Sequence, residues 1–199
     1  MSTLKETLKK KIDEHRPRTV RLLKEYGDTK ISDVTIAQAI GGARGVKCLV
    51  TDVSYLDPFE GIRFRGRTIP ETFAALPAVE GQAYPAVEGF FYYLMTGDIP
   101  TAEQAEEVVA DFKTRRQLPQ YVKDIMRAMP ADTHPMTMFS AGIVAMQRES
   151  EFVKRYNEGM NKMEYWEPMF EDSCNLMAKL PTLAAFIYRL KYKNDEQID

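Results

Sequence analysis

The chain has 199 residues, of which 44% are hydrophobic and 28% charged, and its formal net charge is −2 at pH 7. This length accommodates one sizeable core without a second domain, and the near-neutral charge argues against a protein that binds nucleic acid through a broad basic field. No apolar run approaches the roughly 20 residues that span a membrane, and no apolar N-terminal segment indicates secretion. We therefore expect a globular protein of the cytoplasm, with no membrane or nucleic-acid partner.

The few cysteines and histidines limit the chemistry of the chain. Cys48 and Cys174 lie far apart in the sequence, which disfavours a disulfide framework or a zinc site, and both are expected to be buried as small apolar side chains. His15 lies among charged residues and is expected in solvent, whereas His134 precedes Pro135 and is expected to position or cap a helix. Two histidines exclude a three-histidine metal site and disfavour a Ser-His-Asp triad.

The first forty residues predict two short helices and then a strand. Thr3 and Glu6 form a capping box, and apolar residues follow at helical spacing. Pro17 is predicted to interrupt this helix, and Gly27 to end the next one. Residues 31–40 alternate weakly between apolar and polar side chains, which favours a strand.

Residues 41–66 are the only long stretch that does not predict helix. Glycines on both sides of Arg44 predict a flexible turn, and the β-branched and aliphatic residues of 47–55 predict a strand. Asp57 and Pro58 begin a turn signal. The residues that follow alternate between apolar and cationic side chains: Ile62, Arg63, Phe64 and Arg65. The stretch therefore predicts a small antiparallel β-hairpin.

From residue 67 onward the chain predicts helices separated by proline and glycine. Helices are expected at 70–76, 88–96, from 101 through 112, 119–129, 135–147, 151–158, 165–179 and 183–190. Pro181 is expected to end or kink the second-last of these. The fold class predicted is mainly α with a small antiparallel sheet near the N-terminus. The chain is expected to be a single unit, with N-terminal helices in 1–30, the sheet in 31–66 and a helical bundle in 67–199.

Two groups of arginines are candidate anion sites. The turn around Arg44 can present backbone N–H groups and one guanidinium to an anion, but it fits neither glycine-rich phosphate-binding motif. By pattern alone, a structural turn is favoured there over a binding site. Arg63, Arg65 and Arg67 form a row that is more typical of a solvated strand face than of a binding site.

Paired acids and methionines have ordinary structural interpretations. Glu149 with Glu151, and Glu171 with Asp172, have no base or metal partner nearby in the sequence, which favours surface positions or ion pairs. Methionines at helical spacing predict a core or an interface, because methionine fills irregular gaps. These are Met126, Met129, Met136, Met138 and Met146. Small residues in helix 135–147 permit close approach of another helix, either from a second copy or within the chain.

Several long motifs in a fixed order carry a family resemblance. They are GGARGVKCLVTDVSYLDPFEGIRFRGRTIPE, VEGFFYYLMTGDIPTAEQ, HPMTMFSAGIVAM, NKMEYWEPMFED and AKLPTLAAFIYR. From about Leu4 to Tyr192 the chain resembles the N-terminal half of a citrate synthase of the mitochondrial branch. The resemblance implies a mainly helical homodimer that condenses acetyl-CoA with oxaloacetate and water to give citrate and CoA. It implies no metal and no redox cofactor, and makes this chain an incomplete large domain.

The resemblance also assigns residues. The family's catalytic histidines and aspartate, and the arginines that hold carboxylates, are expected beyond residue 199, so no catalytic residue is expected in this chain and the chain alone is expected to be inactive. Arg44 matches an arginine that contacts the phosphates of CoA. Lys162 matches a second CoA-phosphate arginine, supplied across the dimer; lysine keeps the charge but loses the bidentate geometry. Helix 135–147 matches part of the dimer interface, and His134 matches a helix start.

Alternative functions remain open at this point. One is a short, non-catalytic dimerisation or regulatory module, and another is a 2-methylcitrate synthase that uses propionyl-CoA. The mitochondrial matrix is the alternative compartment. We also expect helix faces without their C-terminal partners to be apolar and to drive association.

Overall fold

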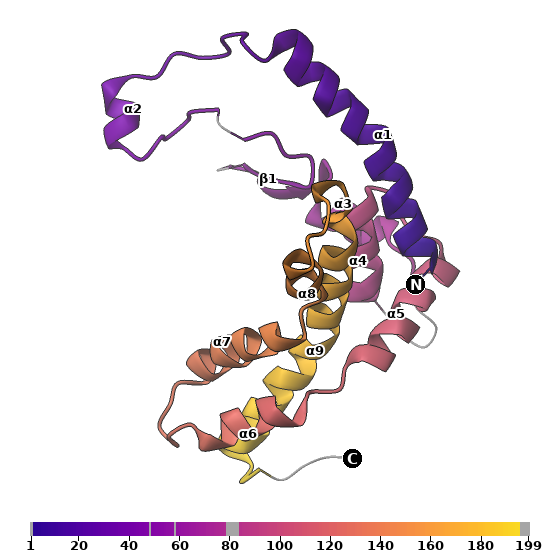
Figure 1. Ribbon diagram of the computed structural model, residues 1–199, viewed down its shortest axis with the longest axis vertical. Helices are drawn as coiled ribbons and strands as arrows, with labels where there is room; N and C mark the ends of the chain where they lie inside the picture. The colour runs from indigo at the N-terminus through magenta and orange to yellow at the C-terminus, as the bar shows by residue number, and fades with distance from the viewer. Residues whose placement is uncertain (1, 48, 58, 79–83, 196–199) are drawn as a thin grey trace. The chain divides into compact units, whose positions relative to one another are not determined.

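The computed structural model describes residues 2–47, 49–57, 59–78 and 84–195 (Figure 1). Contacts between Cα atoms divide the chain into two compact units, Met1–Val108 (unit 1) and Val109–Asp199 (unit 2). Helices predominate in both, which confirms the predicted mainly α class.

Unit 1 combines helices with a small sheet. Its elements are α1 (Ser2–Tyr26), α2 (Ile36–Ile40), β1 (Ser54–Asp57), β2 (Gly61–Phe64), β3 (Arg67–Thr68), α3 (Ile69–Ala75), α4 (Val87–Thr96) and the first half of α5 (Ala102–Arg115). The strands pair in the order β1-β2-β3, and both pairs are antiparallel. The predicted antiparallel hairpin is therefore confirmed.

Two turns build this sheet. Between β1 and β2, the Asp57 carboxylate accepts hydrogen bonds from the backbone N–H groups of Phe59 (2.8 Å) and Glu60 (2.9 Å). These bonds stabilise the charged form and lower the pKa of Asp57. Between β2 and β3, Arg65 (φ 49°) and Gly66 (φ 85°) both adopt positive φ, as a two-residue hairpin turn of the primed type requires.

Three predictions for the N-terminal third are wrong. Helix α1 continues through Pro17, because a proline removes only one helical N–H and the neighbouring turns stay bonded; the Thr19 hydroxyl also donates to the His15 carbonyl (3.3 Å). Residues 36–40 form helix α2, not a strand. The strand predicted over 47–55 is confined to residues from Ser54 onward, where the partner strand β2 is available.

A capping box explains why α2 is helical. The Gln38 backbone N–H donates to Thr35 Oγ1 (3.2 Å), and Thr35 N–H donates to Gln38 Oε1 (3.0 Å). This reciprocal pair satisfies two donors at the helix start. Local capping thus decides the structure where weak alternation of apolar residues suggests a strand.

The core of unit 1 lies around helix α4. Phe91, Tyr92 and Tyr93 of α4 are buried, and α4 packs against α1. Gly89 of α4 is buried and faces α5, since a Cβ at this position would lie in van der Waals contact, 3.5 Å, with the Ala105 Cβ. Helix α4 ends at Gly97 in the left-handed conformation (φ 80°), as the sequence predicts.

The regular secondary structure of unit 2 is all helical among its described residues. It contains the end of α5, then α6 (Gln120–Ala128), α7 (Pro135–Ala145), η1 (Met146–Glu149), α8 (Glu151–Asn157), η2 (Lys162–Glu164) and α9 (Trp166–Tyr192). Pro181 is predicted to end or kink a helix, and α9 continues through it, so the predicted ending is wrong. Buried residues occur on both sides of Pro181, among them Ala178 and Leu183, so tertiary packing offsets the lost hydrogen bond.

The core of unit 2 joins α6, α7 and α9. Val122, Met126, Met138 and Leu183 are almost fully buried there. A Cβ at Gly142 would lie only 2.9 Å from both Leu183 methyl carbons. Any residue larger than glycine at this position of α7 would therefore require the Leu183 side chain to move. The side of helix α7 that carries Gly142 thus packs against α9 of the same chain.

The predicted methionine cluster is confirmed in part. Met126, Met138 and Met146 are buried, and Met129 packs against the same core. Met136, in contrast, is exposed. Among the described residues, no helix combines the length and apolar character needed to span a bilayer.

Candidate functional site

The turn that carries Arg44 is closed by its own hydrogen bonds. The Gly41 N–H donates to Ala37 O (2.9 Å), and the Ala43 N–H donates to Gln38 O (2.8 Å). Gly42, Ala43 and Gly45 all adopt positive φ. These backbone donors at the start of the turn are therefore used internally, and the Arg44 side chain is exposed.

Lys162 begins the short helix η2. Asn161 caps it, accepting a hydrogen bond from the Met163 N–H through its side-chain oxygen (2.9 Å). Arg155 of α8 forms ion pairs with Glu164 of η2 (3.4 Å) and with Glu167 at the start of α9 (2.9 Å). Lys162 itself is exposed. Arg44 and Lys162, the two predicted CoA-phosphate cations, belong to different units of the chain.

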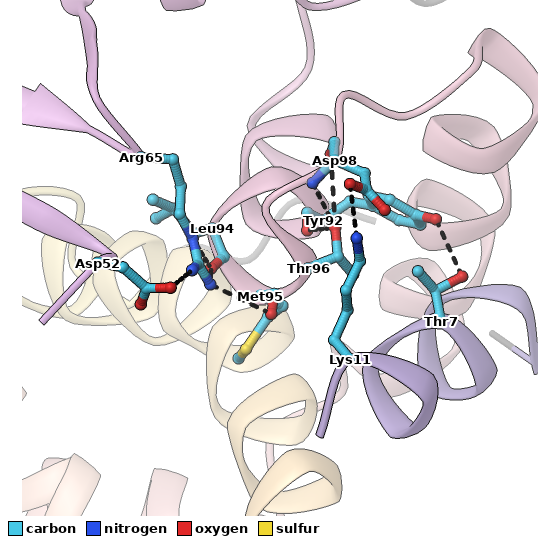
Figure 2. A network of polar contacts seen from close by, with 9 residues as sticks. All are labelled: Thr7, Lys11, Asp52, Arg65, Tyr92, Leu94, Met95, Thr96 and Asp98. Atoms are coloured by element: carbon cyan, nitrogen blue, oxygen red, sulfur yellow. Dashed lines mark hydrogen bonds and ion pairs between the residues drawn. The ribbon is translucent and has the colours of Figure 1, made fainter. Parts of the chain in front are cut away.

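Arg65 does not lie on a solvated strand face, and that prediction is wrong for this residue. Figure 2 shows its guanidinium at the C-terminal end of α4, donating to Leu94 O from Nη2 (2.6 Å) and Nε (3.1 Å) and to Met95 O (3.4 Å). It also forms an ion pair with Asp52 (3.0 Å). Because Arg65 lies in a turn with positive φ, its side chain leaves the strand alternation and satisfies helix-end carbonyls.

The other two arginines of the row have separate surroundings. Arg63 pairs with Glu60 (2.6 Å) and donates to Gly66 O (3.2 Å), and the hydrogen bond with Glu60 raises the pKa of Arg63. Arg67 is exposed, as predicted for a solvated face. Arg63 and Arg65 are thus occupied with the sheet and with α4, so the row does not present three guanidinium groups to a ligand.

A polar cluster between α1 and α4 had no assignment from the sequence (Figure 2). The Lys11 ammonium pairs with Asp98 (2.9 Å), and the Tyr92 hydroxyl donates to Thr7 Oγ1 (3.3 Å). Thr96 Oγ1 donates to Tyr92 O (2.9 Å) and accepts from the Asp98 N–H (3.1 Å). The Thr-Gly-Asp sequence after an aromatic helix is the local signal for the Thr96 part of this cap, but the partners on α1 are remote in sequence.

The histidines have structural positions. His134 Nδ1 accepts a hydrogen bond from the Met136 N–H (3.2 Å) at the start of α7, which confirms the predicted cap. His15 is exposed on α1, as predicted. In both cases the surroundings position or solvate the imidazole and supply no catalytic partner among the described contacts.

Cys174 is buried in unit 2, as predicted, while Cys48 lies outside the described residues. Burial removes solvation from the thiolate and raises the pKa of Cys174 to about 12. The thiol is therefore neutral at physiological pH and is not an activated nucleophile.

Three of the four paired acids have the predicted surface or ion-pair roles, since Glu149 and Glu151 are exposed and Glu171 forms an ion pair. Asp172 caps α8, accepting hydrogen bonds from Ser150 Oγ (2.6 Å) and from the N–H groups of Glu151 (2.8 Å) and Phe152 (3.1 Å). Glu171 pairs with Arg115 at 3.0 Å. Arg115 also pairs with Asp111 (2.7 Å), and both acids favour its charged form, which raises the pKa of Arg115 against the opposing effect of burial.

An open depression of about 220 Å³ lies between α7, η1 and α9 in unit 2. Its wall combines apolar and polar side chains: Ile143, Met146, Gln147, Glu149, Ser150, Asp172, Asn175, Leu176 and Lys179. The charged groups in this wall already have partners, since Lys179 pairs with Glu149 (3.5 Å) and Asp172 caps α8. In the part of the chain that the structure describes, no group of three or more His, Cys, Asp or Glu residues could hold a metal ion.

The fold defines a class of protein. A multi-helical chain with one small three-stranded antiparallel sheet matches the citrate synthase from Pyrobaculum aerophilum with a TM-score of 0.64 and 25% identity. This match covers 80% of the chain and 38% of the Pyrobaculum chain. The family model described as "Citrate synthase, C-terminal domain" matches residues 42–199. The chain therefore belongs to the citrate synthase family.

Relatives of known identity agree. The chain is 47% identical over 192 residues to the mitochondrial citrate synthase of Aspergillus niger, a match that covers 96% of the chain and 40% of the relative. It is 43% identical over 197 residues to the peroxisomal citrate synthase of Saccharomyces cerevisiae, with 97% and 43% covered. The chain thus spans about two fifths of the length of these relatives.

Proposed function

We propose that the chain is the N-terminal part of the large domain of an enzyme that makes citrate from acetyl-CoA, oxaloacetate and water. The observation that carries this proposal is the family match over residues 42–199, with 47% identity to a citrate synthase along nearly the whole chain. Units 1 and 2 then belong to one large domain. In the complete reaction the acetyl methyl group loses a proton, attacks the oxaloacetate carbonyl, and hydrolysis of the thioester releases CoA.

The role proposed for this segment is recognition of the CoA phosphates. Arg44 is exposed on a turn whose backbone is held by internal hydrogen bonds, so little ordering of the main chain accompanies binding. A guanidinium suits a phosphate because it donates two parallel hydrogen bonds. Lys162, also exposed, supplies a second positive charge as a compact ammonium.

CoA binding tests both residues. We expect Arg44→Ala to weaken CoA binding to the complete enzyme roughly tenfold, which corresponds to one charged hydrogen-bond pair. Lys162→Arg restores a bidentate donor and is expected to tighten binding by about threefold or more. Arg67→Ala, a matched change at another exposed arginine, is the control and should leave affinity unchanged. Equal affinities for all three variants would remove the assignment.

The chain by itself is proposed to be inactive. Its histidines cap a helix or lie in solvent, and the buried thiol is neutral, so neither the histidines nor Cys174 supply an activated base or nucleophile. The purified chain should release no CoA thiol from acetyl-CoA in the presence of oxaloacetate, whereas the complete protein should. Oxaloacetate-dependent thiol release by the 199-residue chain contradicts the inactivity. Comparing acetyl-CoA with propionyl-CoA in the complete protein separates citrate synthesis from 2-methylcitrate synthesis.

We further propose that α7 contributes to a homodimer, as the expected interface at 135–147 implies. Gly142 packs internally on α9, but Met136, Ser140 and Val144 are exposed at successive four-residue intervals and so share one face of the helix. A non-catalytic dimerisation module is the second candidate, because the same exposed face supports it. Val144→Asp should reduce dimerisation in sedimentation experiments under either function, and CoA release by the complete protein distinguishes the two.

The compartment is also a proposal. We place the protein in the cytoplasm, with the mitochondrial matrix as the alternative that the printed name of the Aspergillus relative supports. Imaging of the tagged complete protein decides between them.

A further inference from the structure

The segment that carries Lys162 joins the end of α8 to the start of α9, and we call residues 158–165 the Lys162 loop. The loop begins with a left-handed helix cap. Gly159 adopts positive φ (86°), and the Met160 N–H donates to the Arg155 carbonyl in the last turn of α8 (3.1 Å). The backbone therefore leaves α8 in a defined direction, which fixes where the loop starts.

The Arg155 side chain joins this loop to the helices on both sides of it. Its Nη1 donates to Glu167 in the first turn of α9 (2.9 Å), and its Nη2 pairs with Glu164 of η2 (3.4 Å). The hydrogen bond with Glu167 raises the pKa of Arg155, so the guanidinium stays charged. One residue of α8 thus holds both the far end of the loop and the helix that follows it.

Helix α8 packs against α9 (Figure 1), and contacts at both ends of α8 support this packing. At the N-terminal end, Asp172 of α9 accepts a hydrogen bond from the Phe152 N–H (3.1 Å). At the other end, the ring of Tyr156 lies beside that of Tyr165, with centroids 6.0 Å apart. These contacts and the guanidinium bridge hold the two ends of the loop close together.

The charges in the loop make the bridge relevant to anion binding. Glu164 lies two residues from Lys162 and carries the opposite charge. A carboxylate without a cationic partner at this distance in sequence would compete with a phosphate for the ammonium and would repel the phosphate itself. Because Arg155 pairs with Glu164 and Glu167, both negative charges are balanced, while Lys162 is exposed.

We propose that Arg155 is a positioning residue for the contact between Lys162 and the CoA phosphates. It holds the Lys162 loop in place and occupies the Glu164 carboxylate, which would otherwise compete for the ammonium. This inference rests on the proposed function, since the phosphate contact of Lys162 belongs to it. Arg155 acts through Lys162 and is not itself a phosphate ligand.

Steady-state kinetics of the complete enzyme with two acetyl thioesters test this role. Acetyl-CoA carries the phosphates, and S-acetylpantetheine lacks them. Arg155→Met should raise KM for acetyl-CoA about threefold to tenfold with kcat nearly unchanged, because binding energy from the phosphates is lost. It should change kcat/KM for S-acetylpantetheine by less than about twofold. A general structural defect, in contrast, would impair both thioesters alike.

Arg127→Met is the matched control. Arg127 is also an arginine of unit 2 with two acidic partners, Asp124 (4.0 Å) and Asp195 (2.7 Å). Its side chain is 38% exposed and that of Arg155 is 32% exposed. Arg127 lies at the end of α6, away in sequence from the loop, so this variant should leave KM for both thioesters unchanged.

Two further variants separate positioning from general stability. Arg155→Lys keeps the charge but loses the fork that reaches two carboxylates, so KM for acetyl-CoA should rise less than in Arg155→Met. Glu164→Gln, added to Arg155→Met, removes the competing carboxylate and should recover part of the lost affinity for acetyl-CoA. A double variant no better than Arg155→Met would contradict the competition.

Lys162→Ala distinguishes failure of this inference from failure of the proposed function. If Lys162→Ala raises KM for acetyl-CoA and Arg155→Met does not, Lys162 binds phosphate without Arg155 and the inference is overturned. Equal losses with both thioesters in Arg155→Met also overturn it, since the role of Arg155 is then structural. If Lys162→Ala leaves KM for acetyl-CoA unchanged, the proposed phosphate contact is wrong and the inference is overturned with it.

Discussion

Helix α9 and the exposed segment 17–60, which we call the arm, both carry large apolar side chains along their length, yet they differ in burial. Leu183, Phe186 and Ile187 of α9 are buried against α6 and α7, within ninety residues of sequence. Leu23, Ile36 and Val50 of the arm are exposed. Hydrophobicity therefore indicates that a residue needs a partner, while the partner itself is decided by the part of the chain within reach. Unit 2 contains its own partners, and the arm does not.

The largest expected difference concerns two leucines. Leu183 is 0% exposed and Leu23 is 67% exposed. Leu183→Ala should lower the free energy of unfolding by about 2–5 kcal/mol, because it removes buried contacts and leaves a cavity. Leu23→Ala should change it by less than about 0.5 kcal/mol. Urea denaturation of the two variants measures both; equal effects would show that the arm is packed in the isolated chain.

A smaller effect is expected at the end of α4. Arg65→Ala should cost about 1.5–3 kcal/mol, because it removes charged hydrogen bonds to Leu94 O and the ion pair with Asp52. Arg65→Lys retains the positive charge and, like Arg65→Ala, still requires positive φ at this turn. It should therefore recover part of the lost stability. Arg67→Ala is the exposed control. If all three variants unfold at the same urea concentration, Arg65 does not stabilise the helix end.

Close packing of α7 on α9 gives a test of similar size. Gly142→Ala places a Cβ 2.9 Å from the Leu183 methyl carbons and should cost about 1–3 kcal/mol through overpacking. Ser140→Ala, on the exposed side of the same helix, should be neutral or slightly stabilising, because alanine has the higher helix propensity. Thermal unfolding of both variants compares the buried and exposed sides of α7 directly, and a neutral Gly142→Ala would contradict the close approach.

Thiol reactivity compares the accessibility of a buried position in unit 2 with that of an exposed position in the arm. In a Cys48→Ser background, Cys174 should react slowly with a thiol reagent at about pH 8, because its pKa is raised to about 12 by burial. A cysteine introduced by Val50→Cys in the arm, with Cys174 also replaced by serine, should react at the rate of a free thiol. Comparable rates at the two positions would show that unit 2 opens as readily as the arm.

The same thiol predicts a dependence on alkaline pH. The folded-state pKa of Cys174 lies above its ordinary value of 9.0, so the folded chain holds the proton more tightly than the unfolded chain. Its contribution to stability is complete below pH 9.0 and is lost as the pH rises toward about 12. Cys174→Ala should reduce the slope of the free energy of unfolding in this window, measured by urea denaturation; an unchanged slope would place the cause elsewhere.

Local hydrogen bonding explains which elements could be predicted. The turn at Asp57, the cap at His134 and the stop at Gly97 depend on residues within a few positions of one another. Helix α2 departs from the predicted strand because the capping box at Thr35 fixes a helix start, which the weak alternation in 31–40 does not indicate. The site residues remain a family-based proposal; what the structure adds is that Arg44 and Lys162 are both exposed.

The order of motifs in the sequence determined the family, and local patterns determined most helices and the hairpin. Only the tertiary structure decided that α9 continues through Pro181, that Gly142 meets Leu183, and that Arg65, in the turn after β2, caps α4. The physical reason is the separation in sequence between a residue and its partners. Caps and turns are satisfied by neighbours in sequence, whereas burial and long-range ion pairs depend on which elements meet in space.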